Sequence, residues 1–187
     1  MKISETKLPG VFIFEPKVFS DDRGFFLETW SQQRYHEAGI SSPFVQDNVS
    51  LSQKGTLRGL HFQHPHAQGK LVQVLSGEVM DVAVDIRSGS PTFGQWVSVI
   101  LSQSNHKQVY IPPGFAHGFC VISDTAIFAY KCTEYYDPSA EGGVIWNDAD
   151  IGIRWPIENP ILSAKDTAYP RLTDIPHESL PRFGKTS

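Results

Sequence analysis

Residues 56 to 87 contain two runs in which apolar and polar side chains alternate, and no other feature limits the possible folds as strongly. Alternation with a period of two is typical of β-strands that bury one face. The same stretch carries several basic groups, on Arg58, His61, His64, His66 and Lys70. Because strands with a buried apolar face rarely carry so many basic groups, the stretch predicts a functional site on a β-rich scaffold.

Two of these basic residues, Arg58 and His61, differ by an odd number of positions. In a flat strand over residues 56–63 their side chains would therefore point to opposite faces. Gly59 lies between them. A glycine there permits a β-bulge, which inserts one residue into the strand and can turn both side chains inward. We therefore predict a bulge at Gly59.

The rest of the chain supplies further short strands, separated by Gly- and Pro-containing turns. We expect these strands over residues 25–30, 49–51, 70–75, 78–86, 95–101, 108–111, 118–122 and 126–134. Ser76-Gly77 predicts a tight hairpin between residues 70–75 and 78–86. Strands of this length and spacing predict an all-β closed barrel or jelly roll.

The remaining segments predict little regular structure. Residues 7–19 form an extended N-terminal segment and residues 20–24 a turn. One helix is expected, with Ser31 as its N-cap, Ala38 near its end and Gly39 after it. Short turns or helical pieces are expected at residues 148–151, 159–162 and 166–169. The length of 187 residues predicts one domain over residues 1–187, with the barrel core at roughly residues 45–140.

Charge and composition limit the possible partners. The formal charge of −4 gives no electrostatic reason to expect a nucleic acid or an anionic membrane as a partner. The first ten residues lack the apolar core of a signal peptide, and no apolar run is long enough to span a bilayer. Cys120 and Cys132 fit reduced thiols better than a disulfide scaffold, although two thiols could pair. We therefore expect a cytoplasmic protein.

Two spaced motifs resemble those of the cupins. His64-x-His66, followed by Lys70 and Gly77, resembles the first cupin motif, and Pro112-x-Gly114-x-x-His117 resembles the second. The resemblance implies a cupin-like jelly roll, also called a double-stranded β-helix. Metal-binding cupins carry a glutamate ligand where this chain has Lys70. Because an ammonium group repels a cation, we expect no metal at this site.

A closer resemblance extends over nearly the whole chain, to the dTDP-4-dehydrorhamnose 3,5-epimerase family. It rests on Asp22-Arg23-Gly24-Phe25-Phe26-x-Glu28, Gln46-Asp47-Asn48-x-Ser50, Leu57-Arg58-Gly59-Leu60-His61-Phe62-Gln63, Gln68-Gly69-Lys70-Leu71 and Pro112-Pro113-Gly114-Phe115-Ala116-His117-Gly118-Phe119. It implies that a dTDP-4-keto-6-deoxyhexose is inverted at both carbons beside the ketone, in the third step of dTDP-L-rhamnose synthesis. It also implies a homodimer that uses neither a metal nor a redox cofactor.

The resemblance assigns a role to each catalytic candidate. A proton beside a ketone is weakly acidic, so its removal needs a positioned base and stabilisation of the enolate. His61 is similar to the family base and Asp166 to its carboxylate partner. Lys70 and His117 are suited to the enolate, and Tyr130 matches the acid that returns a proton from the opposite face.

The substrate-binding candidates also come from the resemblance. Tyr136 resembles the aromatic residue that stacks on the thymine, and the adjacent Tyr135 is an alternative for that role. The full set is Arg23, Phe25, Glu28, Gln46, Asn48, Arg58, Lys70, His117, Tyr136, Glu141 and Lys165.

Several candidates also have ordinary structural interpretations. His64 and His66 fit loop histidines in contact with solvent better than ligands. Arg23 could pair with a neighbouring aspartate in a turn, Tyr130 could be a core residue, and Asp166 could be a turn residue.

Other functions remain open beside the double epimerase. One is a metal-dependent cupin that uses His64, His66 and His117, and another is a sugar-binding cupin without catalysis. Within the resembled family, single-carbon epimerases and ketoisomerases are further alternatives.

Overall fold

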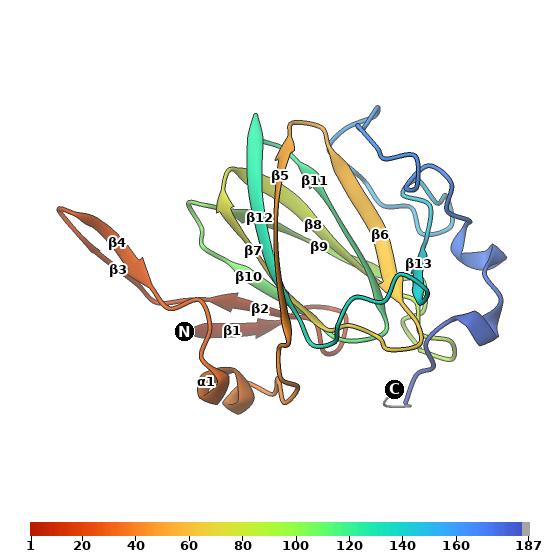
Figure 1. Cartoon of the computed structure of the whole chain (residues 1–187), viewed down its shortest axis with the longest axis horizontal. Coiled ribbons are helices and arrows are strands. Elements are labelled where there is room, and N and C mark those ends of the chain that lie inside the picture. The colour runs from red at the N-terminus through yellow and green to blue at the C-terminus, as the bar shows by residue number, and fades with distance from the viewer. Residues whose placement is uncertain (185–187) are drawn as a thin grey trace.

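The computed structural model, which describes residues 1–184, is built almost wholly from antiparallel strands (Figure 1). The six-stranded sheet contains, in spatial order, β1 (Lys2–Glu5), β2 (Phe12–Glu15), β10 (Gln108–Ile111), β7 (Lys70–Ser76), β12 (Thr125–Cys132) and β5 (Gln46–Gln53). The five-stranded sheet contains β13 (Glu141–Gly143), β6 (Leu57–Gln63), β11 (Phe115–Val121), β8 (Glu78–Asp85) and β9 (Trp96–Ser102). The predicted all-β, cupin-like jelly roll is confirmed.

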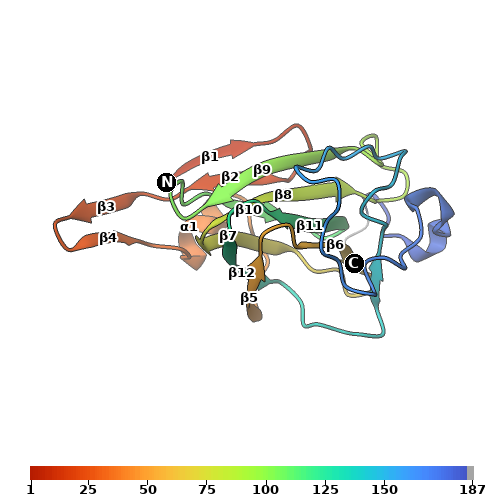
Figure 2. The same ribbon diagram turned by 90° about the horizontal axis from the view of Figure 1, so that it is seen from above.

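The two sheets face each other across an apolar interior (Figure 2). Phe119 on β11 and Phe128 on β12 stack across this interior, with their ring centroids 4.1 Å apart. Strand β8 shows the expected alternation, since Val79 and Ala83 face the other sheet whereas Val82 packs outward against the C-terminal segment. Inward-facing positions at one end of this interior carry the polar side chains described below.

The bulge predicted at Gly59 is confirmed. Between β6 and β11, Arg58 pairs with Phe119 and His61 pairs with His117, so that three steps on β6 match two on β11. Because Phe119 faces the interior, the extra residue turns both Arg58 and His61 toward the interior. A Cβ atom at Gly59 would lie 2.5 Å from the Cα atom of Gly118, so no larger residue fits there.

The hairpin predicted at Ser76-Gly77 is wrong. β7 pairs with β10 and β12, whereas β8 pairs with β11 and β9, so the chain crosses from one sheet to the other at Gly77. Gly77 has a φ of +82°, and a Cβ atom there would lie 2.1 Å from the carbonyl oxygen of Thr125. Glycine is thus needed for a corner between sheets rather than for a hairpin turn.

The helix prediction is correct in place but not in its cap. Helix α1 spans Gln32–Glu37, and Ser31 occupies the N-cap position without a capping side-chain hydrogen bond. Gly39 follows the helix in a left-handed conformation, with a φ of +96°, as expected. Residues 148–151 and 166–169 lie in turns and loop rather than helices, and the described helical pieces near the C-terminus are η1 (Leu172–Asp174) and η2 (His177–Ser179). Within residues 1–184, no helix combines the length and the apolar character that a membrane span requires.

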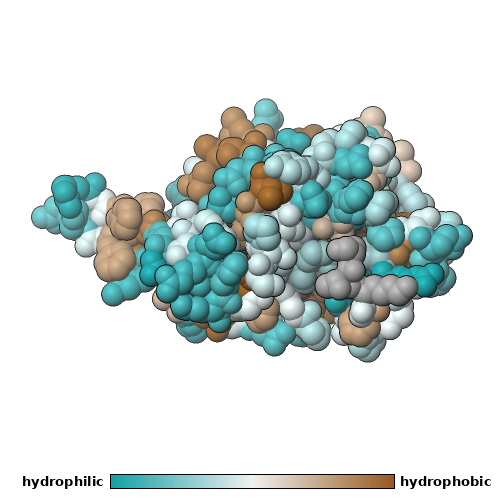
Figure 3. Space-filling view, turned by 60° about the horizontal axis from the view of Figure 1, so that its bottom comes forward, coloured by the Kyte–Doolittle hydropathy of each residue, from teal (hydrophilic) through white to brown (hydrophobic). Residues whose placement is uncertain are grey.

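A two-stranded arm projects away from the two large sheets (Figure 1). It consists of β3 (Val18–Asp21) and β4 (Gly24–Leu27). β3 overlaps the end of the predicted extended segment and the start of the predicted turn, and β4 overlaps the predicted strand at residues 25–30. Phe25 and Phe26 on β4 are 60% and 70% exposed. Figure 3 shows apolar side chains along this arm, with hydrophilic side chains at its tip. A projecting arm with exposed aromatic side chains is typical of a surface that contacts a partner.

A buried ion pair lies where β8 ends. The Asp85 carboxylate is fully buried and accepts hydrogen bonds from Arg87, Ser90 and Thr92. Burial acts to raise the pKa of Asp85, but these hydrogen bonds outweigh it and hold the pKa below its usual range. The guanidinium of Arg87 also lies over the rings of Phe115 and Phe183. The pair therefore fixes the strand end and two loops together.

We expect Asp85→Asn to lower the free energy of unfolding by about 3 kcal/mol at neutral pH, because Arg87 loses its buried partner. A depressed carboxyl pKa stabilises the fold above the unfolded-state pKa of about 3.9, and this contribution is lost as the pH falls through the folded-state value. The difference between wild type and variant should therefore shrink on acidification below about pH 4, as measured by urea unfolding. Asp124→Asn is the control and should leave the free energy of unfolding unchanged, because the Asp124 side chain is 98% exposed. A difference that grows on acidification would contradict this assignment.

Candidate active site

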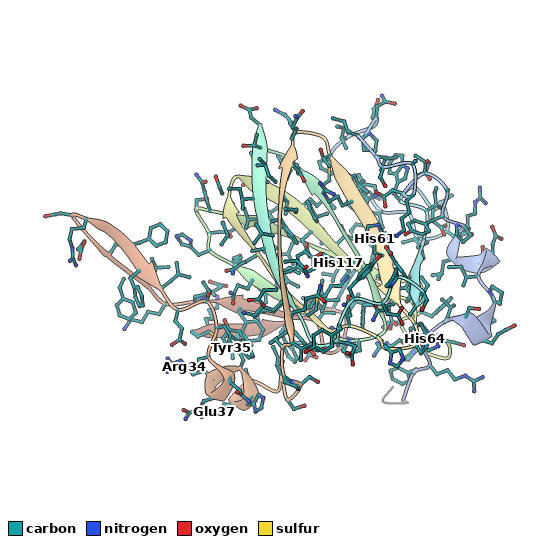
Figure 4. The ribbon with its side chains drawn as sticks, viewed as in Figure 1. Arg34, Tyr35, Glu37, His61, His64 and His117 are labelled. Carbon is teal, nitrogen blue, oxygen red and sulfur yellow. The ribbon has the colours of Figure 1, made fainter. Side chains whose placement is uncertain are left out.

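Polar side chains from both sheets meet at one end of the interior. His61 on β6 and His117 on β11 are partners in the five-stranded sheet, and Figure 4 shows them side by side between the sheets. Lys70 on β7 and Tyr130 on β12 come from the opposite sheet, and each lies two positions from an inward-facing core residue, Val72 or Phe128, and so faces the same interior. The structure thus brings together four of the predicted residues from four different strands.

His61 forms a pair with Asp166, as predicted. Its Nε2 atom donates a hydrogen bond to Oδ1 of Asp166 over 2.5 Å, so Nδ1 of the neutral imidazole is left as a proton acceptor. Ser163 Oγ donates to the other carboxylate oxygen over 2.8 Å. Burial acts to raise the pKa of Asp166, but the hydrogen bonds from His61 and Ser163 outweigh it and hold this pKa below its usual range. Asp166 is therefore a buried, ionised partner of His61 as well as a turn residue.

A second histidine–carboxylate pair lies beside the first. Nε2 of His117 donates to Oδ2 of Asp81 over 2.7 Å, and both residues are buried. Sequence reasoning missed Asp81, although a carboxylate at an inward-facing position between Val79 and Ala83 was a usable signal. Because buried carboxylates require partners, the aspartate itself indicated that a cation or donor faces it.

Lys70 occupies the position where a metal-binding cupin would carry a glutamate. Burial lowers the pKa of its ammonium group, while the nearby Cys132, Glu141 and Asp81 act in the opposite direction. Its ammonium group thus lies near the carboxylate that binds His117. This placement puts an amine and its neighbouring carboxylate inside a low-dielectric site, where polar groups act strongly on a bound substrate.

Tyr130 faces the interior from the sheet opposite His61. Its ring lies 6.0 Å from that of Phe128, as expected for a core residue. Burial raises the pKa of its hydroxyl, and Cys132 and Glu141 act in the same direction, whereas Arg58 acts against them. The phenol therefore stays protonated at neutral pH, which is the state that a proton donor requires.

The predicted binding residues form a polar rim around this interior. Tyr136 donates from Oη to Glu141 over 2.6 Å, and Lys165 forms an ion pair with the same carboxylate. Gln46 accepts a hydrogen bond from the backbone N–H of Tyr136 and donates one to Asn48.

Arg58 completes the rim on its far side. Its guanidinium donates to Ser52 Oγ over 3.0 Å, at the other end of β5 from Gln46. The side chain of the adjacent Tyr135 is 65% exposed and forms no hydrogen bond within residues 1–184, whereas that of Tyr136 is bonded to Glu141, so Tyr136 remains the candidate for stacking.

Three predicted binding residues lie elsewhere in the same chain. Arg23 pairs with Asp21 at the tip of the arm, as its alternative interpretation suggested, and Glu28 pairs with Arg34. Phe25 contacts His106, with ring centroids 4.7 Å apart. Arg23 and Phe25 lie on the arm, outside the space between the sheets, and Glu28 directly follows it (Figure 1). A substrate-binding role for these residues remains a prediction and requires the arm of a second chain.

His64 differs from the exposed loop histidine that we expected. It is half-buried, and its Nδ1 atom has no hydrogen-bond partner within residues 1–184. His66 is exposed, as predicted, with a positive φ of 62°. In the part of the chain that the structure describes, no three His, Cys, Asp or Glu side chains are placed to hold a metal together.

Comparisons with known proteins agree with this geometry. Residues 5–174 match the family model described as dTDP-4-dehydrorhamnose 3,5-epimerase. The chain belongs to the dTDP-4-dehydrorhamnose 3,5-epimerase family. The epimerase of Salmonella typhimurium is 58% identical over 175 residues, which cover 92% of this chain and 96% of that protein.

Solved structures of epimerases have the same fold. The dTDP-6-deoxy-D-glucose-3,5-epimerase of Legionella pneumophila, in complex with dTDP-4-keto-L-rhamnose, superimposes with a TM-score of 0.96 at 54% identity and covers 98% of this chain and 99% of that one. ChmJ, a 3'-monoepimerase from Streptomyces bikiniensis in complex with dTDP-quinovose, is more distant, with a TM-score of 0.88 at 34% identity over 95% of this chain and 92% of that one. Epimerases of both kinds therefore share this architecture.

The His61–Asp166 pair leads to a graded prediction for this epimerase. His61→Asn removes the proton acceptor at similar volume and should lower kcat by about 10² to 10⁴. Asp166→Asn should cause a smaller loss, because the imidazole remains and only its orientation and charge balance change. His66→Asn is the matched control and should retain wild-type kcat, because this side chain is exposed. Steady-state kinetics would contradict the pairing if Asp166→Asn kept full activity.

Proposed function

We propose that the protein converts dTDP-4-dehydro-6-deoxy-D-glucose into dTDP-4-dehydro-L-rhamnose by epimerisation at C3 and C5, within dTDP-L-rhamnose synthesis. One observation carries this proposal. The paired base His61 and the protonated phenol of Tyr130 come from opposite sheets and face one interior. Inversion of a carbon requires a base on one face of the sugar and a donor on the other, whereas binding alone requires neither.

The reaction begins with removal of a proton from the carbon beside the ketone. Nδ1 of His61 accepts this proton, since Nε2 already donates to Asp166. The ionised Asp166 stabilises the imidazolium that forms, as a buried carboxylate does for a paired histidine. The two electrons of the broken C–H bond move to the carbonyl oxygen and generate an enolate.

The enolate oxygen needs positive or hydrogen-bonding groups that are already in place. Lys70 supplies an ammonium group from β7. The His117 imidazole, which Asp81 binds through Nε2, is the second polar group on this side of the site. Asp81 therefore holds His117 in orientation, and no metal or redox cofactor takes part in the proposed chemistry.

Inversion is completed from the other face. The hydroxyl of Tyr130 gives its proton to the carbon, the C=O bond re-forms, and a phenolate is left. The imidazolium of His61 loses its proton to solvent, and Tyr130 regains one before the next carbon reacts. The nucleotide and sugar would be held by the rim, through stacking on Tyr136 and polar contacts with Gln46, Asn48, Arg58, Glu141 and Lys165.

A homodimer belongs to this proposal because two apolar surfaces are left exposed in the single chain. Val49 and Leu51, on the edge strand β5, are 68% and 67% exposed, and the arm carries the exposed Phe25 and Phe26. Apolar surface of this kind indicates a partner surface. A second copy would cover it and would bring Arg23 and the other arm residues to the neighbouring site.

The free thiols Cys120 and Cys132 fit a reducing compartment such as the cytoplasm.

The proposed reaction is tested in heavy water. With dTDP-4-keto-6-deoxyglucose, the wild type should incorporate solvent deuterium at C3 and C5 and invert both carbons, as followed by NMR. Tyr130→Phe deletes only the hydroxyl, so His61 can still remove a proton and return one to the same face. This variant should therefore wash deuterium into recovered substrate while it forms little epimer. Inversion at one carbon only would make the protein a mono-epimerase, and activity that requires an added divalent ion would favour the metal-dependent alternative.

The shared site is tested by complementation. His61→Asn and Arg23→Ala homodimers should each have low activity. After the two variants are mixed and subunits exchange, each hybrid dimer holds one site with wild-type His61 and a wild-type arm, so activity should rise. Arg154→Ala, at an arginine outside both the arm and the site, replaces Arg23→Ala in the control. No gain on mixing, with subunit exchange shown by native mass spectrometry, would rule out a site shared between chains.

A further inference from the structure

The space beside His61 is filled by a residue that the mechanism above does not use. Gly143 on β13 is the pairing partner of His61 and has no side chain. The ring of Tyr169 occupies the place where that side chain would be, since a Cβ atom at Gly143 would lie 2.5 Å from its carbons. This leaves the Tyr169 ring edge-to-face with the imidazole of His61, with ring centroids 5.8 Å apart and an interplanar angle of 66°.

The ring of Tyr169, rather than its hydroxyl, makes this contact. The Tyr169 hydroxyl is buried and points away from His61 toward Lys165, although it forms no hydrogen bond of regular geometry within residues 1–184. Burial raises its pKa to about 12, so the hydroxyl is neutral at working pH. Edge-to-face contacts depend on the aromatic ring itself, which phenylalanine would keep.

Tyr169 and Asp166 are also held by the same short segment. The backbone N–H of Thr167 donates to Ser163 and that of Ala168 donates to Lys165, which closes a turn directly before Tyr169. The segment thus presents two contacts to one imidazole: a carboxylate at Nε2 and an aromatic ring at the side. A single hydrogen bond fixes one nitrogen but leaves the ring free to swing about it, and the second contact limits that motion.

We propose that Tyr169 is a positioning residue for the base: its ring, seated in the space that Gly143 leaves free, holds the His61 imidazole in line for proton transfer. This inference rests on the proposed function, in which His61 is the base. Because reacting groups must be held to within a fraction of an ångström, loss of this contact should lower the rate of proton removal more than substrate binding.

Two substitutions of Tyr169 separate the ring from the hydroxyl. Tyr169→Phe should keep kcat within about twofold of wild type, because the edge-to-face contact remains. Tyr169→Ala should lower kcat by about tenfold to a hundredfold, with KM and the affinity for TDP changed much less. Deuterium exchange into substrate should slow in the same proportion as kcat, since the base performs the first step.

Gly143→Ala tests the contact between Tyr169 and His61 by a change on β13 instead of a change at Tyr169. The nearest atoms to the added methyl group all belong to the Tyr169 ring, so this variant should displace the ring and lower kcat in a similar way. In the Tyr169→Ala background, Gly143→Ala should cause little further loss, because the ring it displaces is gone. Such non-additivity identifies two residues that act through one contact.

Gly142→Ala is the matched control on the same strand. Its methyl group would meet the ring of Phe62 at 2.6 Å on the outer face of the sheet, away from His61. It should lower the midpoint of thermal unfolding while leaving kcat per folded molecule unchanged. If Gly143→Ala and Gly142→Ala affect stability and kcat alike, Tyr169 has only a structural role and the proposal fails.

The outcomes also separate this proposal from the proposed function. If the wild type does not epimerise the dTDP-keto sugar, the proposed function fails and the inference with it. If the wild type is active but Tyr169→Ala and Gly143→Ala both keep kcat within twofold, only the positioning role is overturned. Equal losses in Tyr169→Phe and Tyr169→Ala would assign the effect to the hydroxyl and would also overturn it. Should Tyr169→Ala fail to fold, Gly143→Ala and Tyr169→Phe still decide the question.

Discussion

The close approach of β6 and β11 at Gly59 and Gly118 is the constraint on which the site depends. A side chain at Gly59 would collide with the backbone of the neighbouring strand, so the bulge can form only with glycine at this point. The bulge in turn allows Arg58 and His61 to face the same interior despite their odd spacing. Without it, one of the two would point into the outer apolar layer, where a charge or an imidazole would be buried without its partner.

The interior keeps its polar groups because each buried carboxylate has a specific partner. Asp81 binds His117 and Asp166 binds His61, and Lys70 adds an ammonium group on the facing sheet. Groups that are held in this way need not reorganise when charge develops on a substrate, and this is how a fixed polar environment stabilises a transition state. The apolar stack of Phe119 and Phe128 borders the same space, since the His117 ring also stacks on that of Phe128 with centroids 6.1 Å apart.

The sequence pattern and the family resemblance together predicted the strands, the bulge and most of the candidate site. The alternating strands and the bulge followed from spacing and from one glycine, and the resemblance supplied Asp166, which lies 105 positions from His61. The corner at Gly77 was mistaken for a hairpin because the same Ser-Gly sequence serves both, and only distant strands decide the pairing. Asp81 was missed because its partner lies 36 positions away. The pairing of Arg23 with Asp21 was predicted from local sequence, but any contact of Arg23 with a substrate could not be derived, since a single chain does not contain the surface that its arm would contact.

The division of the two proposed proton-transfer groups between different sheets has a consequence for stereochemistry. The apolar side chains packed between the two sheets set the distance between His61 and Tyr130. Phe119 and Phe128 are part of this packing, with ring centroids 4.1 Å apart. A change of volume in this stack would widen or narrow the gap without touching either group. In the proposed reaction, the fidelity of inversion, meaning how often the enolate is protonated from the far face rather than the near one, therefore depends on this hydrophobic packing as well as on the acid and the base.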